Sequence, residues 1–123
     1  MANSNYLFVY GTLKPKSGLL EKLGLNYKIV GQGFVEGIEI KDTDYPALVP
    51  SLKNDKQLIL GEIIELKEPE DSFKKLDEYE EFNPKDKQNS LYIRKKTKVK
   101  FKNGKSTACW IYWFNLKKIL VST

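Results

Sequence analysis

Apolar residues recur along much of this chain with the two-residue period of a β-strand. Tyr6–Tyr10 is a short β-prone run that ends at Gly11 and predicts a buried strand. The apolar residues of Tyr27–Ile40 are interrupted by glycines, which is typical of one long bent strand or two short ones. Leu58–Leu66 predicts another strand, and the proline-containing segment Asp42–Lys56 before it predicts a loop.

Two other segments have the period of a helix. In Ser17–Leu23, Ser17 suits the N-cap position, three leucines face inward, and Gly24 follows as a stop signal. Pro69–Glu81 is the stronger candidate, because proline suits the first turn and the acidic residues after it complement the helix dipole.

One acidic side chain of this second helix falls among its apolar residues. At 100° per residue, Phe73 and Leu76 lie about 60° apart, and Glu80 falls between them, whereas Glu78 and Glu81 point away. A carboxylate buried in this way would have a raised pKa and could act as a general base. The alternative is that the helix ends elsewhere and Glu80 is one more solvated acid.

The C-terminal part of the chain predicts a hairpin. Asn83–Ser90 is polar and turn-rich and predicts a loop, and Leu91–Lys102 then follows a period of two, with basic residues on one face and Ile93, Val99 and Phe101 on the other. Asn103–Gly104 is a strong two-residue hairpin signal, and the aromatic segment Ser106–Phe114 provides the partner strand. The whole pattern predicts an α+β fold, a small bent and mostly antiparallel β-barrel of roughly five or six strands with one or two helices.

Composition narrows the chemistry. The chain has 123 residues, which predicts a single domain over residues 1–123, and its 41% hydrophobic and 30% charged residues exclude a disordered protein. It has no histidine and one cysteine, so a Ser-His-Asp triad, a Cys-His dyad and a cysteine-rich zinc or iron–sulfur site are excluded. Acid–base chemistry near neutral pH must therefore come from a carboxylate, a lysine, a tyrosine or Cys109.

The N-terminus has no basic region, and no stretch approaches the roughly 20 apolar residues that a membrane span needs. A single cysteine cannot form an internal disulfide, so we expect a cytoplasmic protein with no membrane partner. The sequence carries no prediction of an oligomeric state.

The net charge of +5 raises the question of a nucleic-acid partner. One face of the predicted strand Leu91–Lys102 is basic, and it consists of Arg94, Lys96, Lys98, Lys100 and Lys102. Lysines on one side and apolar residues on the other are also the ordinary solvent face of a half-buried sheet. No exposed aromatic positions interleave with these lysines to stack bases, so we expect no nucleic-acid partner.

Two further features could build a site. Tyr10, Gly11, Thr12 and Leu13 follow the first strand, and the glycine allows successive backbone N–H groups to converge on a carboxylate. Most such turns are only turns. The aromatic residues of Ser106–Phe114 belong to the core by default, but one face of that strand could line a pocket.

Together these segments resemble the γ-glutamylcyclotransferase-like superfamily, which includes γ-glutamylamine cyclotransferases and avirulence-induced-gene-like proteins. Short motifs similar to those of the family occur in its order and cover roughly residues 6 to 114. They are Phe8–Lys14, the Tyr-Pro-Ala-Leu of Tyr45–Leu48, the Gly-Glu strand at Gly61–Glu65, the Leu-Asp-x-aromatic-Glu of Leu76–Glu80, and the Tyr-x-Arg of Tyr92–Arg94.

The resemblance implies a small α/β fold around a bent barrel, with Glu80 as the catalytic acid–base residue and the loop Tyr10–Leu13 as the substrate-binding segment. Further pocket positions are Tyr45, Tyr92, Arg94 and Tyr112, although Arg94 could equally form an ordinary surface ion pair. Many family members have glycine directly after the catalytic glutamate, where this chain has Glu81. A side chain there could crowd the turn or add negative charge beside Glu80.

The activity implied by the resemblance is intramolecular aminolysis of a γ-glutamyl compound, which releases 5-oxoproline and needs no metal and no organic cofactor. The group on the γ-carbonyl could be an amino acid, a lysine isopeptide or a small amine. A non-catalytic binding protein on the same scaffold, a related lyase or transferase acting on γ-glutamyl groups, and a nucleic-acid-binding module remain alternatives.

Overall fold

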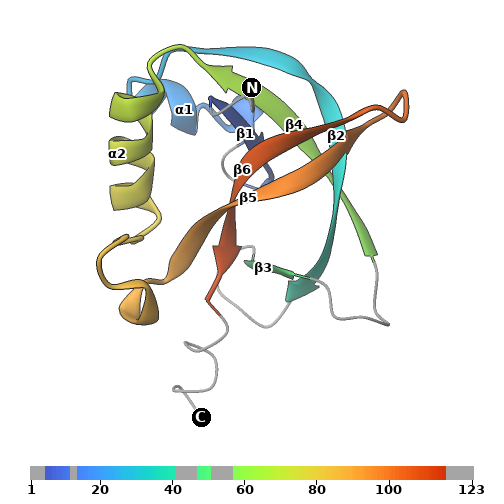
Figure 1. The fold of residues 1–123 in the computed structure, drawn as a ribbon. Helices are drawn as coiled ribbons and strands as arrows, with labels where there is room; N and C mark the ends of the chain where they lie inside the picture. Colours follow the sequence, from blue (N-terminus) through green and yellow to red (C-terminus); the bar gives the residue numbers. More distant parts are fainter. Residues whose placement is uncertain (1–4, 12–13, 41–46, 51–56, 116–123) are drawn as a thin grey trace.

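A computed structural model of the chain describes residues 5–11, 14–40, 47–50 and 57–115, and all structural statements below refer to these residues. They form a curved sheet with helices on one side (Figure 1). The strands are β1 (Tyr6–Val9), β2 (Tyr27–Ile40), β3 (Ala47–Pro50), β4 (Gln57–Leu66), β5 (Tyr92–Phe101) and β6 (Ser106–Phe114). The helices are α1 (Leu19–Lys22), α2 (Pro69–Tyr79) and two 3₁₀ turns, η2 (Pro15–Ser17) and η3 (Lys87–Asn89).

The sheet closes into a five-stranded barrel, which confirms the predicted fold class. Its strands follow the order β2-β4-β1-β6-β5, and β5 pairs again with β2 to close the ring. All neighbours are antiparallel except β1 and β6, which pair in parallel at Leu7 and Trp110. The barrel therefore joins the first strand of the chain to the last described one.

The long strand β2 is continuous, as one of the two predicted alternatives required. It runs along β4 over most of its length, and its register shifts between Ile29 and Gly31, so the strand bends there. Beyond this shared region β2 also pairs with β3, antiparallel over Gly37–Ile40 and Ala47–Pro50. The prediction of a loop over Asp42–Lys56 is therefore wrong for Ala47–Pro50, because a sheet edge supplies hydrogen bonds that local sequence does not reveal. The rest of that segment lies outside the described residues.

The helices begin and end within two residues of the prediction. In the first, the 3₁₀ turn η2 and Gly18, whose φ is 78°, precede α1. Ser17 is therefore not the N-cap, although its side-chain oxygen still accepts a hydrogen bond from the N–H of Leu19 at 3.3 Å. The second helix, α2, begins at Pro69 as expected and ends at Tyr79, two residues before the predicted end.

Two hydrophobic clusters lie on the two faces of the sheet. One draws buried residues from all five barrel strands and fills the barrel, with Phe8, Ile63 and Ile111 among its members. The other packs the helices onto the outside of the barrel through Phe73 and Leu76 of α2. Because α2 is attached by these apolar residues, its C-terminal end has a defined position over the barrel wall.

Glycine permits the tight closure of the barrel. Gly61 in β4 stands opposite Gly33 in β2. A Cβ atom added at Gly61 would lie only 2.5 Å from both the Phe8 ring and the carbonyl oxygen of Val9. β1 can therefore approach β4 closely only because Gly61 has no side chain.

None of the helices among the described residues is both long and apolar enough to cross a membrane.

Candidate active site

Glu80 is the C-cap residue of α2, directly after the last helical turn. Phe73 and Leu76 are buried on the same helix, which turns Glu80 toward the barrel as the sequence predicted. The side chain is half-buried, and this desolvation raises the pKa of Glu80 from 4.5 to about 7. A carboxyl group of this kind can both accept and return a proton near neutral pH.

The chain turns sharply after Glu80 through two backbone hydrogen bonds. The N–H of Phe82 donates to the carbonyl of Asp77 at 2.8 Å, and the N–H of Glu81 donates to the carbonyl of Glu78 at 3.2 Å. This pairing is the Schellman arrangement, which places the residue after the cap in the left-handed region. Glu81 is that residue, with φ at 54°, the only positive φ at a non-glycine position among the described residues.

The structure therefore gives a physical reason for the glycine that many family members have at this position. We expected that a side chain here could crowd the turn, but the Glu81 side chain is exposed and does not. The cost of a non-glycine residue lies in the backbone conformation instead. The charge of Glu81 does not account for the raised pKa of Glu80, because burial is the cause of that shift.

Two tyrosine hydroxyl groups lie within electrostatic reach of Glu80. Tyr10, at the end of β1, and Tyr112, in β6, both have a pKa above the ordinary value, mainly because they are buried and partly because of the Glu80 charge. The Tyr10 hydroxyl donates to the backbone carbonyl of Tyr112 at 2.6 Å, which joins the ends of the two strands. Tyr92 in β5 also contributes to the raised pKa of Tyr10.

The structure thus brings together four of the residues predicted for the site: Glu80, Tyr10, Tyr92 and Tyr112. A backbone hydrogen bond from Leu48 to Tyr10 adds the end of the Tyr-Pro-Ala-Leu segment to the same region. Tyr45 itself lies outside the described residues, as do Thr12 and Leu13. Gly11 has a φ of 58°, and its carbonyl accepts a hydrogen bond from the N–H of Lys14 at 3.2 Å, so the loop turns at the predicted glycine.

Asp77 is the residue that the sequence reasoning missed. Its carboxylate accepts two hydrogen bonds from the Arg94 guanidinium, at 2.9 and 3.1 Å, and a third from the Tyr112 hydroxyl at 2.6 Å. The Arg94 and Asp77 side chains are only 17% and 14% exposed. Asp77 therefore ties α2 to both strands of the β5–β6 hairpin, one helical turn before Glu80.

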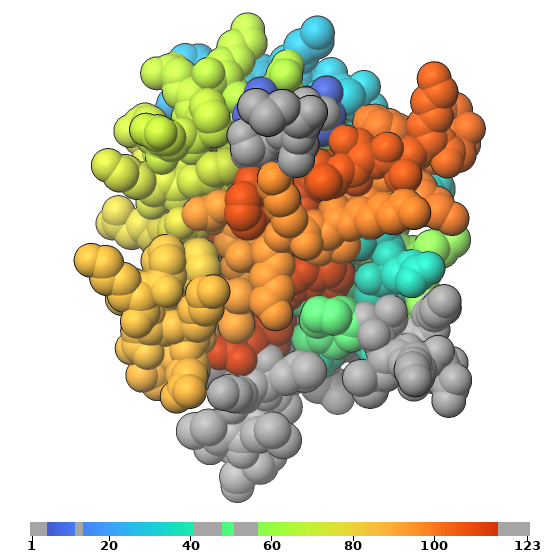
Figure 2. Space-filling model, viewed as in Figure 1, coloured from blue at the N-terminus to red at the C-terminus, as the bar shows by residue number. Residues whose placement is uncertain are grey.

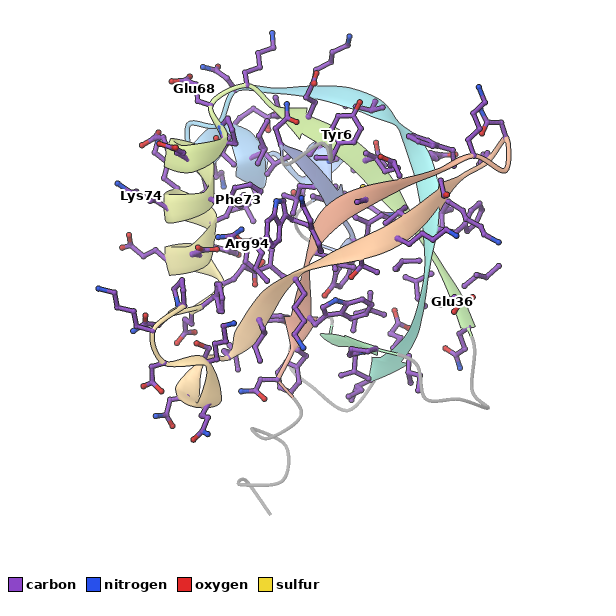
Figure 3. The ribbon with its side chains drawn as sticks, in the orientation of Figure 1. Tyr6, Glu36, Glu68, Phe73, Lys74 and Arg94 are labelled. Atoms are coloured by element: carbon purple, nitrogen blue, oxygen red, sulfur yellow. The ribbon has the colours of Figure 1, made fainter. Side chains whose placement is uncertain are left out.

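Arg94 thus belongs to a buried network and is not the ordinary surface ion pair considered above. Its guanidinium lies over the Phe73 ring, 4.2 Å from the centroid, and 4.7 Å from that of Trp110 (Figure 3). Asp77 stands inside the same Leu-Asp-x-aromatic-Glu motif as Glu80. Its spacing of three residues from Glu80, which places both on neighbouring helix turns, was the signal that could have found it.

No group of three or more acidic or cysteine side chains among the described residues is arranged to hold a metal ion. Cys109 is fully buried in the barrel, and desolvation raises the pKa of its thiol to about 12. A thiol in such surroundings stays protonated and packs as a small apolar group.

The fold and this region define a class of protein: a small α+β barrel in which the charge of a half-buried glutamate at a helix terminus acts on two buried tyrosine hydroxyls. The family model described as gamma-glutamyl cyclotransferase, AIG2-like, matches residues 7–122. The chain therefore belongs to this family, as the motifs indicated. A search of curated proteins finds no match.

Solved structures with the same fold come from organisms as different as mouse and Bacillus subtilis. A mouse AIG2-like protein is 24% identical with a TM-score of 0.65, and the match covers 89% of this chain and 76% of that one. YkqA from Bacillus subtilis is 24% identical with a TM-score of 0.68, over 90% of this chain but 36% of that one. A protein named gamma-glutamyl cyclotransferase is 16% identical with a TM-score of 0.59, over 89% and 66% of the two chains. At these identities the likeness establishes the fold.

Proposed function

We propose that this protein is a γ-glutamyl cyclotransferase that releases 5-oxoproline from a γ-glutamyl amine, amino acid or isopeptide. The observation that carries the proposal is the half-buried carboxyl group of Glu80, whose pKa is raised to about 7 and whose charge reaches the hydroxyl groups of Tyr10 and Tyr112. Membership of the gamma-glutamyl cyclotransferase, AIG2-like family supports the same reaction class.

In the proposed reaction the α-amino nitrogen of the glutamyl unit attacks its own γ-carbonyl carbon. A new C–N bond closes the five-membered ring, and the bond from the same carbon to the leaving nitrogen breaks. Glu80 accepts a proton from the attacking nitrogen and returns it to the leaving one, so no proton or water is consumed overall. Both reacting groups belong to one molecule, so the main task of the protein is to hold the curled conformer.

The other residues have supporting roles in this proposal. Backbone N–H groups of the segment Tyr10–Leu13 bind the α-carboxylate or the developing oxyanion of the substrate. The Tyr10 hydroxyl is already engaged with the Tyr112 carbonyl, so it forms a wall of the pocket and keeps water from Glu80. Asp77 is a positioning residue, because it holds Arg94 and Tyr112 and thereby the end of α2. The remaining pocket positions proposed here are Tyr45 and Tyr92.

The test is to incubate the protein with a panel of γ-glutamyl amino acids, γ-glutamyl amines and γ-glutamyl-ε-lysine, and to measure 5-oxoproline by mass spectrometry. The matched variants are Glu80→Gln, which keeps the shape but removes the base, and Glu78→Gln, which changes an exposed glutamate on the same helix. We expect product with the wild type and Glu78→Gln and at least about a hundredfold less with Glu80→Gln.

The pH dependence provides a second readout. The reaction needs Glu80 ionised, so the rate with the best substrate should rise as the pH increases through about 7. Equal rates for Glu80→Gln and the wild type would refute the assignment of the base. Binding of a panel compound with no turnover by any protein would instead identify a binding protein on this scaffold.

A further inference from the structure

A groove separate from Glu80 opens on the face of the barrel that carries β5. It has a volume of about 750 Å³, and strands β2, β3, β4, β5 and β6 all contribute to its lining. Figure 2 shows this face, with atoms of β6 in red visible between β5 in orange and β3 in green. Its apolar lining comes from Phe34, Pro50, Leu58, Phe101 and Trp113.

In the described part of the chain, the charged lining of the groove is almost entirely cationic. Among the described lining residues one is acidic, Glu36 on β2 (labelled in Figure 3), and five are lysines that belong to β5 or directly follow it. The lysines are Lys95, Lys96, Lys98, Lys100 and Lys102. All five are exposed, and none of them forms an ion pair among the described residues. The groove therefore attracts a partner with several negative charges in a row.

Among the described residues, the wall made by β5 is also an open strand edge. β5 pairs with β2 only at Lys100 and Phe101, and from Lys95 to Val99 its described strand partner is β6 alone. In Figure 1, β5 and β2 are close near the β5–β6 hairpin and separate below it. Backbone N–H and C=O groups on the free side of such a strand can pair with another extended chain.

We propose that this groove binds an extended acidic peptide segment of a partner protein, which adds as a strand to β5. The segment would place carboxylates against the lysine row on one side and apolar side chains against the groove floor on the other, as strand alternation allows. From Lys95 to Val99 the free edge of β5 spans about 13 Å, so about five residues of the segment can pair with it, and the residues that flank them reach the lysines beyond.

The lining favours a peptide over single-stranded nucleic acid. Nucleic acid without sequence preference needs aromatic faces on which bases stack. In this groove Trp113 is only 4% exposed and its indole N–H is engaged by the Thr97 hydroxyl at 3.2 Å, while Phe34 and Phe101 are half-buried. Exposed Leu58, at 66%, suits an aliphatic partner side chain instead.

The probe for this proposal is a fluorescein-labelled peptide of about seven residues with alternating Glu and Val, titrated by fluorescence anisotropy. One control peptide has Gln in place of Glu, and another has proline at its central position, which removes a backbone donor. Oligothymidylate of similar length tests the nucleic-acid alternative. The groove variant is Lys98→Glu with Lys100→Glu, and the matched control is Lys28→Glu with Lys74→Glu, which changes exposed lysines on β2 and α2.

We expect saturable binding of the acidic peptide that weakens with added salt, and at least about tenfold weaker binding by the groove variant, by the Gln peptide and by the proline peptide. The control variant and Glu80→Gln should bind like the wild type, because the groove does not depend on the proposed catalytic residue. In ¹⁵N NMR spectra the amides of Lys95–Val99 should shift on binding.

Several outcomes would overturn the proposal. They include no binding at about 1 mM peptide, tighter binding of oligothymidylate than of peptide, and an equal loss in the groove and control variants. Unchanged binding by the proline peptide would also contradict it, because strand addition needs the backbone donor. A dispersed NMR spectrum of the unbound groove variant, changed only near the two substitutions, provides the check that it is folded.

Discussion

Replacing Glu80 by glutamine should stabilise the folded protein, and the gain should grow as the pH rises. Burial raises the pKa of Glu80 from 4.5 to about 7, so the folded state resists an ionisation that the unfolded chain accepts. Each pKa unit is worth about 1.4 kcal/mol, so a shift of about 2.5 units means that ionised Glu80 costs the folded protein about 3–4 kcal/mol. Glutamine has nearly the same shape and carries no charge, so the variant avoids this cost.

The direction of the pH dependence follows from proton counts. Below pH 4.5 the carboxyl group is protonated in both states, and the wild type and Glu80→Gln should be about equally stable. Between pH 4.5 and about 7 the folded state binds more protons than the unfolded chain, so this group lowers wild-type stability as the pH rises. Above that window the difference between the two proteins should stay constant at its maximum.

Urea unfolding of both proteins at pH values from about 4 to about 8 measures this difference directly. The control is Glu78→Gln, whose exposed side chain should give a small difference with little pH dependence. A stability difference between Glu80→Gln and the wild type that is flat, or that shrinks with rising pH, would refute the reasoning. It would mean that the Glu80 carboxyl group ionises as readily in the folded protein as in the unfolded chain.

Three further substitutions test the framework around this residue. Glu81→Gly should raise the free energy of unfolding by about 1 kcal/mol because the φ of 54° suits glycine, whereas Glu81→Ala should not; urea unfolding separates the two. Asp77→Ala should lower the free energy of unfolding by about 2–4 kcal/mol because Arg94 loses its buried partner. In a double-mutant cycle, adding Arg94→Met should restore part of this loss. Gly61→Ala should destabilise by about 1–3 kcal/mol, since its methyl group would meet the Phe8 ring; an unchanged thermal midpoint would contradict that contact.

The elements with strong local signals could be predicted from sequence. The helix α2 combines Pro69 at its first turn with inward Phe73 and Leu76, and the β5–β6 hairpin has alternation on both sides of Asn103–Gly104, so both were found nearly to their ends. The helical period also turned Glu80 inward, and the structure confirms its burial.

What could not be predicted depends on contacts between segments distant in sequence. β3 becomes a strand only because the edge of β2 is beside it. The role of Asp77 exists only where Arg94 and Tyr112, 17 and 35 residues further along the chain, reach the same carboxylate. The spacing of Asp77 from Glu80 could have marked it as a neighbour of the site, but no local pattern shows its partners, because an aspartate on a helix is ordinarily a solvated surface residue.

The parallel pairing of β1 with β6 has a consequence for the order in which the molecule is made. The hydrogen bond from Tyr10 to the Tyr112 carbonyl joins residues 102 positions apart, so one half of the region around Glu80 leaves the ribosome long before the other. Until β6 has been made, β1 can pair only with β4 and presents an unpaired strand edge. Unpaired edges of this kind make nascent chains prone to aggregation. The proposed site therefore comes into existence only with the last strand of the barrel, so a prematurely terminated chain would lack activity even if most of the barrel had formed.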